Sequence, residues 1–240
     1  MLHISKTTKE VLNAAAEYFV KTADEAIAKQ GRFTVALSGG SSPKGLFELL
    51  ASEYHSKVDW TKVFFFFGDE RYVPADHPDS NALMAKKALF DSLKISPNQI
   101  FAIDTSLQPK ETAEAYQKEI EKHFAPGLPT FDLILLGLGD DAHTASLFPH
   151  TEVVNATEIG VKEIFVPEKN VYRITFTAPL INLAYHIAFL VFGSSKAEAV
   201  RHVLKGDKEY NSYPAQLIQP SNGDVAWFMD EEAALKINSN

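Results

Sequence analysis

Short apolar runs alternate with longer segments of helical periodicity along the chain. The apolar runs have the length and continuity of strands buried inside a sheet. We predict strands at residues 33–37, 63–67, 100–103, 131–136, 171–176, 187–192 and 225–229. Amphipathic helices are predicted between them, at residues 7–30, 46–54, 79–92, 109–124 and 197–204. Because strands and helices alternate, we expect an α/β protein with a mostly parallel sheet.

Composition narrows the class of protein. The chain has 240 residues, 45% of them hydrophobic, which is enough for one α/β domain with a sizeable core. It has no cysteine and no apolar stretch long enough to span a bilayer, and its beginning lacks the apolar core of a signal peptide. We therefore expect a cytoplasmic protein with no membrane partner. The net charge of -8 and the scattered basic residues argue against a nucleic-acid partner.

The loop after the first predicted strand has the composition of an anion-binding site. Residues 38–45 read Ser-Gly-Gly-Ser-Ser-Pro-Lys-Gly and lead directly into a helix. The backbone N–H groups of Gly39 and Gly40 and the hydroxyls of Ser41 and Ser42 would converge on the positive end of that helix. It is not a Walker loop, because no Lys-Ser/Thr pair follows the last glycine. A tight turn with a serine N-cap is the alternative.

Basic side chains follow two other strands. The segment Gly68-Asp-Glu-Arg71 comes directly after residues 63–67, and an arginine there has the fork of donors that binds phosphate or carboxylate. An internal ion-pair cluster is the alternative. Gly193-Ser-Ser-Lys196 opens another helix, where a cation is unfavourable. An anion bound beside Lys196 would explain its position, and a solvated surface lysine fits the pattern as well.

Two carboxylates and an imidazole follow the apolar run 131–136. They are Asp140, Asp141 and His143, and we expect a short helix to begin at residues 144–147. Histidine exchanges protons near neutral pH, and a carboxylate two residues away can fix its tautomer. A helix cap and a loop histidine are an equally simple alternative. Since adjacent parallel strands end at one edge of the sheet, we expect these polar loops to lie together.

Other chemistries lack their motifs. The eight histidines show no HExxH or HxH spacing, so we expect no metal site. A serine hydrolase is also not expected, because the sequence has no Gly-x-Ser-x-Gly elbow.

Five segments in order resemble the glucosamine-6-phosphate isomerase/6-phosphogluconolactonase family: ALSGGSSPKGLFELL, FFFGDERYVPADHPDSN, LILLGLGDDAHTASLFP, RITFTAPLINLAYHIAFLVFGSSKAEAV and YPAQLIQPSNGDVAWFMDEEAA. The resemblance spans nearly the whole chain. It implies one domain, residues 1–240, with a three-layer α/β/α fold and a Rossmann-like sheet. It also implies that the chain hydrolyses the sugar-phosphate lactone 6-phospho-D-glucono-1,5-lactone to 6-phospho-D-gluconate, in the oxidative pentose phosphate pathway. Neither a metal nor an organic cofactor is implied.

The resemblance assigns roles to individual residues. His143 matches the family's catalytic histidine and Asp141 the aspartate that precedes it, and we expect Arg71 to contribute to catalysis as well. The predicted phosphate-binding residues are Gly39, Gly40, Ser41, Ser42, Arg71 and Lys196, with Asp69 and Arg173 in the same substrate pocket. Ala142 departs from the family, which usually has glycine there. If this position needs φ > 0, alanine costs on the order of 1 kcal/mol.

Two other functions stay open. A glucosamine-6-phosphate deaminase would share the phosphate loop, but typically has Asp-Glu-Tyr after the second strand and a glutamate soon after the histidine. Here these positions read DERY and SLFP, which favours the lactonase. A non-catalytic sugar-phosphate-binding protein would not need the pair Asp141 and His143. A monomer and a small homo-oligomer are both compatible with the sequence.

Overall fold

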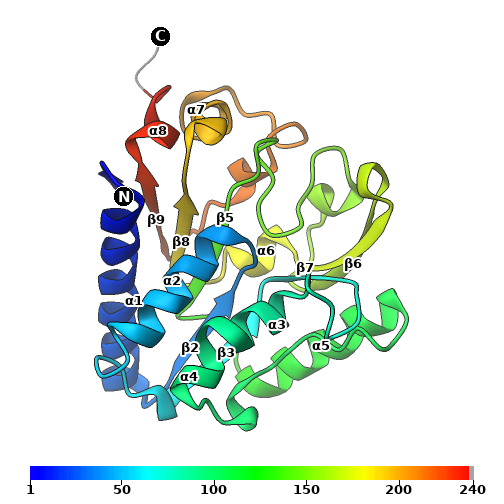
Figure 1. Ribbon diagram of the computed structural model, residues 1–240. Helices are drawn as coiled ribbons and strands as arrows, with labels where there is room; N and C mark the ends of the chain where they lie inside the picture. Colours follow the sequence, from blue (N-terminus) through cyan, green and yellow to red (C-terminus); the bar gives the residue numbers. More distant parts are fainter. Residues whose placement is uncertain (238–240) are drawn as a thin grey trace.

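A six-stranded parallel sheet forms the centre of the computed structural model, which describes residues 1–237 apart from the side chain of Glu168 (Figure 1). The strand order is β1-β9-β8-β5-β2-β3. These strands are β1 (Leu2–Ser5), β2 (Phe33–Leu37), β3 (Val63–Phe67), β5 (Leu133–Gly137), β8 (His186–Val191) and β9 (Asp224–Asp230). A small antiparallel sheet has the order β4-β7-β6, formed by β4 (Asp69–Arg71), β7 (Val171–Phe176) and β6 (Val161–Val166). The mostly parallel α/β fold is thus confirmed.

The helices are α1 (Thr8–Gln30), α2 (Ser41–Ser52), α3 (Asn81–Ala85), α4 (Asp91–Leu93), α5 (Pro109–Phe124), α6 (Ala178–Ile181), α7 (Ala197–Lys205) and α8 (Glu231–Ala234). The helix predicted at residues 79–92 is divided, because a π-helical turn at Lys86–Phe90 separates α3 from α4. Within residues 1–237, no helix combines the length and the apolar character needed to cross a membrane.

Consecutive phenylalanines of β3 show how helices cover both faces of the sheet. Phe65 packs on Trp60 and on Phe90 beside α4, with ring centroids 6.4 and 4.9 Å away. Phe66 points to the other face, where it contacts Phe124 at the end of α5. Successive side chains of a strand alternate between faces, so an apolar run such as VFFFF requires a helix layer on each side. This arrangement produces the three layers visible in Figure 1.

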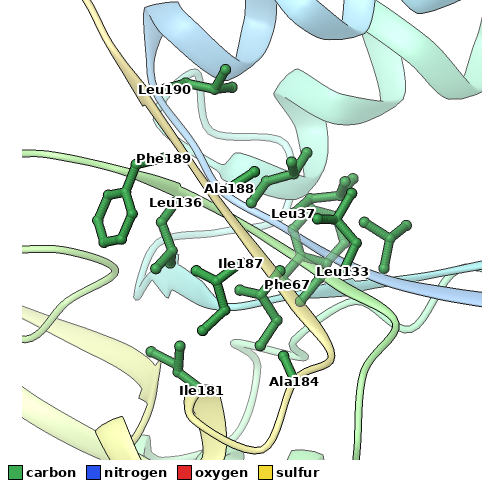
Figure 2. Packing of buried hydrophobic residues seen from close by; sticks show 14 of the residues in the cluster. Leu37, Phe67, Leu133, Leu136, Ile181, Ala184, Ile187, Ala188, Phe189 and Leu190 are labelled. Atoms are coloured by element: carbon green, nitrogen blue, oxygen red, sulfur yellow. The ribbon is translucent and has the colours of Figure 1, made fainter. Parts of the chain in front are cut away.

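The core lies where the central strands meet (Figure 2). Leu37, Leu133, Leu136 and Ile187 are all fully buried. Burying one such side chain contributes roughly 1.5–3 kcal/mol. Because these strands carry almost no polar side chains, the chemistry of the protein is confined to the loops at their ends.

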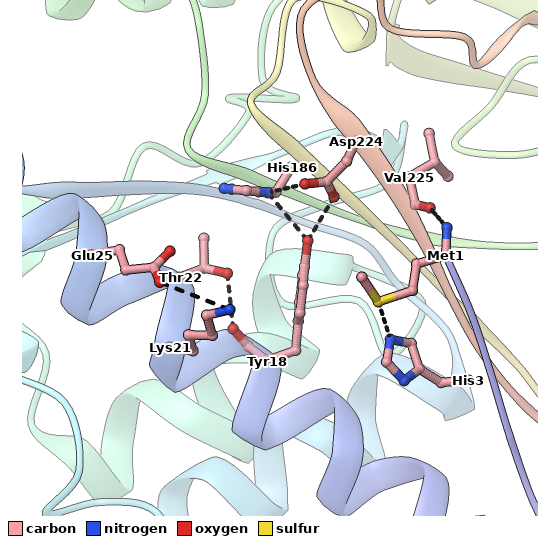
Figure 3. A network of polar contacts seen from close by, with 9 residues as sticks. All are labelled: Met1, His3, Tyr18, Lys21, Thr22, Glu25, His186, Asp224 and Val225. Atoms are coloured by element: carbon pink, nitrogen blue, oxygen red, sulfur yellow. Dashed lines mark hydrogen bonds and ion pairs between the residues drawn. The ribbon is translucent and has the colours of Figure 1, made fainter.

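A polar network ties α1 to the amino-terminal ends of β8 and β9 (Figure 3). The Tyr18 hydroxyl donates to Asp224 at 2.9 Å and lies 3.2 Å from His186 Nδ1, which is 2.8 Å from the other oxygen of Asp224. Burial and then the hydrogen bond to Asp224 raise the pKa of Tyr18 well above its usual value. The network lies at the end of the sheet opposite to the polar loops.

One expectation about strands was wrong, and two strands were missed. Residues 100–103 form only a single bridge, between Ile100 and Phe65, and the chain then leaves the sheet. The short edge strand β1 is half exposed, and four residues are too few for a clear periodicity. The charged segment of β4 gives no apolar signal, although it pairs with β7.

A half-buried histidine makes stability depend on pH. Burial among aromatic rings, and to a lesser degree the charge of Arg32, lowers the pKa of His123 to about 4, and its Nε2 has no hydrogen-bond partner among the described residues. An unfolded histidine has a pKa of about 6.5. As the pH falls from this value to about 4, the unfolded chain therefore binds a proton that the folded chain does not bind. The free energy of unfolding therefore decreases in this window.

We predict that His123→Phe removes this part of the pH dependence. Urea unfolding at pH 7 and pH 5 should show a smaller loss of stability for the variant than for the wild type. The exposed His55 provides a control, because His55→Gln should retain the wild-type difference. If His123→Phe lost as much stability between pH 7 and pH 5 as the wild type, the assignment of this pH dependence to His123 would be contradicted.

Candidate functional site

A cavity of about 250 Å³ opens at the carboxyl ends of β2, β5 and β8. Nearly all of the predicted site residues line it, although they come from five separate parts of the chain: Gly39, Gly40, Ser41, Ser42, Asp69, Arg71, His143, Arg173 and Lys196. Asp141 is not part of the wall and lies behind His143. The expected convergence of the polar loops is confirmed.

The first wall is the amino-terminal end of α2. Gly40 is its N-cap residue, with φ 106°, and no side chain caps the helix. The alternative of a serine cap is therefore wrong, and the first residues of this helix line the cavity. Gly39 must be glycine for a different reason, because a Cβ there would lie 1.8 Å from Oδ1 of the buried Asn81. Such a helix end attracts anions.

Glu70 fixes the second wall. Its two buried carboxylate oxygens accept from the backbone N–H groups of Arg71, Asn81 and Ala82 and from the Ser80 hydroxyl, at 2.7–3.2 Å. Burial raises the pKa of Glu70, and the backbone hydrogen bonds offset this only in part. Glu70 thus binds backbone and does not pair with the Arg71 guanidinium, whose Nη1 donates to the Asp79 carbonyl at 2.7 Å. This geometry differs from the ion-pair cluster that was the alternative.

Two arginines face each other on adjacent strands of this wall. Arg71 of β4 lies in register with Arg173 of β7. Burial and then the charge of Arg71 lower the pKa of Arg173. Like charges in register are destabilising, so this pair is better suited to hold an anion than to stabilise the fold. The acidic neighbour Asp69 is buried and accepts from the Ser146 hydroxyl at 2.7 Å.

His143 and Asp141 form a close pair at the third wall. Nδ1 of His143 lies 2.5 Å from Oδ1 of Asp141, which also accepts from the His143 backbone N–H at 3.1 Å. Partial burial acts to raise the pKa of Asp141, but the hydrogen bond and charge of His143 outweigh it and lower the pKa to about 2. A carboxylate at Nδ1 assigns the proton to that nitrogen, which leaves Nε2 as an acceptor. The imidazole ring stacks on Phe148, with centroids 4.2 Å apart.

The backbone around His143 is strained, and the short helix predicted at residues 144–147 is absent. Ala142 and Ala145 have φ values of 61° and 48°. The Thr144 hydroxyl donates to the Gly137 carbonyl, so its side chain holds the loop to β5 and does not cap a helix. The φ at Ala142 confirms the need for the left-handed conformation that glycine adopts without cost, and alanine costs roughly 1 kcal/mol there.

Lys196 reaches the cavity from the residues that precede α7. Its Nζ lies 2.5 Å from Oδ1 of Asp140, on the loop that also carries Asp141 and His143. The anion expected beside Lys196 is therefore present within the protein itself.

Comparison with known proteins agrees with this geometry. The family model for glucosamine-6-phosphate isomerases/6-phosphogluconolactonase matches residues 6–227. The chain belongs to this family. The 6-phosphogluconolactonase of Nostoc sp. is 44% identical over 220 residues, 90% of this chain and 89% of the relative. That of Synechocystis sp. is 45% identical over 214 residues, 87% of this chain and 86% of the relative.

A solved structure of the family has the same fold over almost the whole chain. The 6-phosphogluconolactonase from Trypanosoma cruzi superposes with a TM-score of 0.86 at 27% identity and covers 99% of this chain and 96% of its own. The family resemblance recognised in the sequence is thus confirmed.

Sequence patterns did not identify some of the residues that line the cavity. Lys169 lines it from the β6–β7 connection, with Nζ 4.7 Å from the centre of the Phe148 ring. Asn81 donates through Nδ2 to the Asp69 carbonyl at 2.9 Å and so joins α3 to β4. No local pattern distinguishes Lys169 from a surface lysine. For Asn81 the sequence offered one signal, its position directly after Ser80, which caps the start of a helix.

Gly139 leaves the room that the His143–Asp141 pair requires. A Cβ on Gly139 would lie 2.0 Å from His143 Nδ1 and 2.4 Å from Asp141 Oδ1. We predict that Gly139→Ala separates the pair and lowers kcat by about 10²-fold or more, the usual contribution of a positioned acid–base group. Gly68→Ala is the control, because its Cβ would meet nothing closer than the Leu37 carbonyl oxygen at 3.7 Å.

Steady-state kinetics with matched circular dichroism spectra would test this. Equal activity of the two folded variants would show that the close pair is not required.

Proposed function

We propose that this protein is a 6-phosphogluconolactonase that hydrolyses 6-phospho-D-glucono-1,5-lactone to 6-phospho-D-gluconate. One observation carries the proposal: an imidazole oriented by a carboxylate at 2.5 Å shares a cavity with a helix end and several basic side chains. The names of the relatives support the same substrate. We further propose that the enzyme acts in the cytoplasm, in the oxidative pentose phosphate pathway.

Binding of the phosphate positions the lactone. The phosphate is proposed to lie at the amino-terminal end of α2, against Gly39, Gly40, Ser41 and Ser42, with Arg71 and Lys196 as cationic partners. Asp69 and Arg173 would contact the sugar portion. Because the phosphate end of the substrate is held, the lactone carbonyl lies near His143. The free energy of binding thus offsets the loss of translational and rotational freedom before the chemical step.

His143 acts as general base and then as general acid in this proposal. Its Nε2 takes a proton from a water molecule as the water oxygen attacks C1, while Asp141 stabilises the imidazolium through Nδ1. The tetrahedral intermediate then collapses, the bond between C1 and the ring oxygen breaks, and His143 returns the proton to that oxygen. The products are a carboxylic acid at C1 and a hydroxyl at C5, so atoms and charge balance.

We assign stabilisation of the developing oxyanion to Arg71. Its guanidinium lines the cavity, and one of its donors is held by the Asp79 carbonyl. A guanidinium oriented in advance stabilises the negative charge without reorganisation during the reaction. Its remaining donors are available for the substrate.

Replacement of the histidine provides the main test. We predict that His143→Gln lowers kcat by roughly 10²- to 10⁴-fold, because the proton transfer to and from the reacting oxygens is lost. KM should change little, since the phosphate-binding residues remain. Lactone consumption must be measured against the spontaneous hydrolysis of the substrate. A variant with most of the catalysed rate would rule out this role, and ammonia release from glucosamine 6-phosphate would instead support a deaminase.

A second test separates phosphate binding from chemistry. Lys196→Gln should lower kcat/KM for the phosphorylated lactone by about tenfold, a typical loss for one charge-assisted hydrogen bond. Hydrolysis of unphosphorylated glucono-1,5-lactone should stay within about twofold of the wild type. Equal losses on both substrates would place Lys196 in the chemistry or in the fold, and would contradict the proposed phosphate contact.

A further inference from the structure

We propose that Asp140 sets the affinity of the cavity by acting as a resident anion on Lys196. In the enzyme without ligand, the Asp140 carboxylate pairs with the Lys196 ammonium group. A phosphate must therefore compete with this carboxylate for the ammonium group. The inference rests on the proposed function only in assigning the phosphate of the substrate to Lys196. Its role is to keep the binding of substrate and product weak enough for turnover.

The contact between the two residues is close and joins separate loops. Lys196 Nζ and Asp140 Oδ1 are 2.5 Å apart, and the Ser195 hydroxyl approaches the same oxygen at 3.4 Å. The Asp140 side chain is 65% exposed, whereas that of Lys196 is 26% exposed. The carboxylate therefore lies at the solvent side of the pair and the ammonium at the cavity side.

The charge of the cavity explains why such an anion is useful. Among the side chains that the structure describes, four cations line the cavity: Arg71, Lys169, Arg173 and Lys196. Asp69 contributes a carboxylate to the described part of the wall, and one of its oxygens is already bound by Ser146. Hydrolysis of the lactone creates a new carboxylate, so the product carries more negative charge than the substrate. A cavity with this much uncompensated positive charge would hold the product more tightly than the substrate.

A purely structural role fits Asp140 less well. The loop is held by backbone hydrogen bonds from Gly139 to His143 and from Ala142 to Gly139, neither of which involves the Asp140 side chain. Lys196 is placed by its own backbone, which donates to the Gly193 carbonyl at 3.1 Å. The carboxylate of Asp140 can therefore be neutralised without removing these backbone hydrogen bonds of either loop.

The test is the isosteric variant Asp140→Asn, studied by isothermal titration calorimetry with inorganic phosphate and with 6-phosphogluconate. We expect both ligands to bind about threefold to tenfold more tightly, because one opposing charge at contact distance has been removed. The gain should shrink as salt rises, since the Debye length is only about 10 Å at 0.1 M. The product inhibition constant should decrease in parallel, and Asp140→Glu should retain wild-type affinity.

Two matched controls isolate the contact with Lys196. Asp91→Asn removes another exposed carboxylate, which pairs with Lys86 on the α3–α4 segment, and should leave ligand affinity unchanged. In a Lys196→Gln background, Asp140→Asn should change affinity by less than about twofold, as a double-mutant cycle requires for two groups that act through each other.

Each other result overturns the inference. Unchanged or weaker binding in Asp140→Asn would show that the carboxylate supports Lys196 or is inert. A gain in affinity that persists in the Lys196→Gln background would show that the Asp140 charge acts on the whole cavity and not through Lys196. Failure of the proposed lactonase function can be distinguished from failure of this inference. It would appear as absent turnover in the wild type, whereas the affinity for inorganic phosphate could still be compared between the wild type and Asp140→Asn.

Discussion

The parallel register of β5 with β2 on one side and β8 on the other determines where every group of the cavity lies. Ala36 pairs with Ile134, and Gly137 pairs with Leu190, so β2 ends slightly before its two neighbours. The chain leaves the sheet close to these strand ends, and glycine or serine residues follow closely after each of them. Because the strands themselves are apolar and buried on both faces, the sheet has little freedom to shift its register relative to the helices. Residues distant in sequence are thereby held in one cavity.

The loop after β5 stores strain where the proposed chemistry takes place. His143 lies between two alanines with positive φ, and Gly139 approaches its ring closely enough to exclude any side chain. Such a conformation persists only when the surrounding structure determines it, and here Thr144 binds β5 while Ser146 binds Asp69 of β4. The same hydrogen bonds that prevent a helix after His143 therefore hold its imidazole against Asp141.

Much of the fold could be predicted from the sequence, because buried strands and amphipathic helices carry strong local signals. β2, β3, β7 and α5 have the predicted bounds. Most of the proposed site residues were predicted as polar groups after strands, whereas Arg173 came from the family resemblance, and the parallel topology explains why the polar loops meet. Features that depend on distant partners were not accessible: β4 is a strand only because β7 pairs with it, and residues 144–147 avoid a helix only because distant side chains compete for the backbone. Lys169 enters the cavity through the geometry of the β6–β7 connection, which no local pattern specifies.

Net charge and local charge have opposite signs in this protein, and the difference is informative. The chain carries a net charge of -8, yet four cations among the described side chains line the cavity at the carboxyl ends of the central strands. Long-range attraction cannot bring a sugar phosphate to an acidic molecule, so short-range contacts must supply the affinity. Contacts of that kind are strong in a partly buried cavity and act on any anion, including the product of the reaction. A site built in this way needs an internal counter-charge at its rim, and the pair formed by Asp140 and Lys196 has the position to provide it.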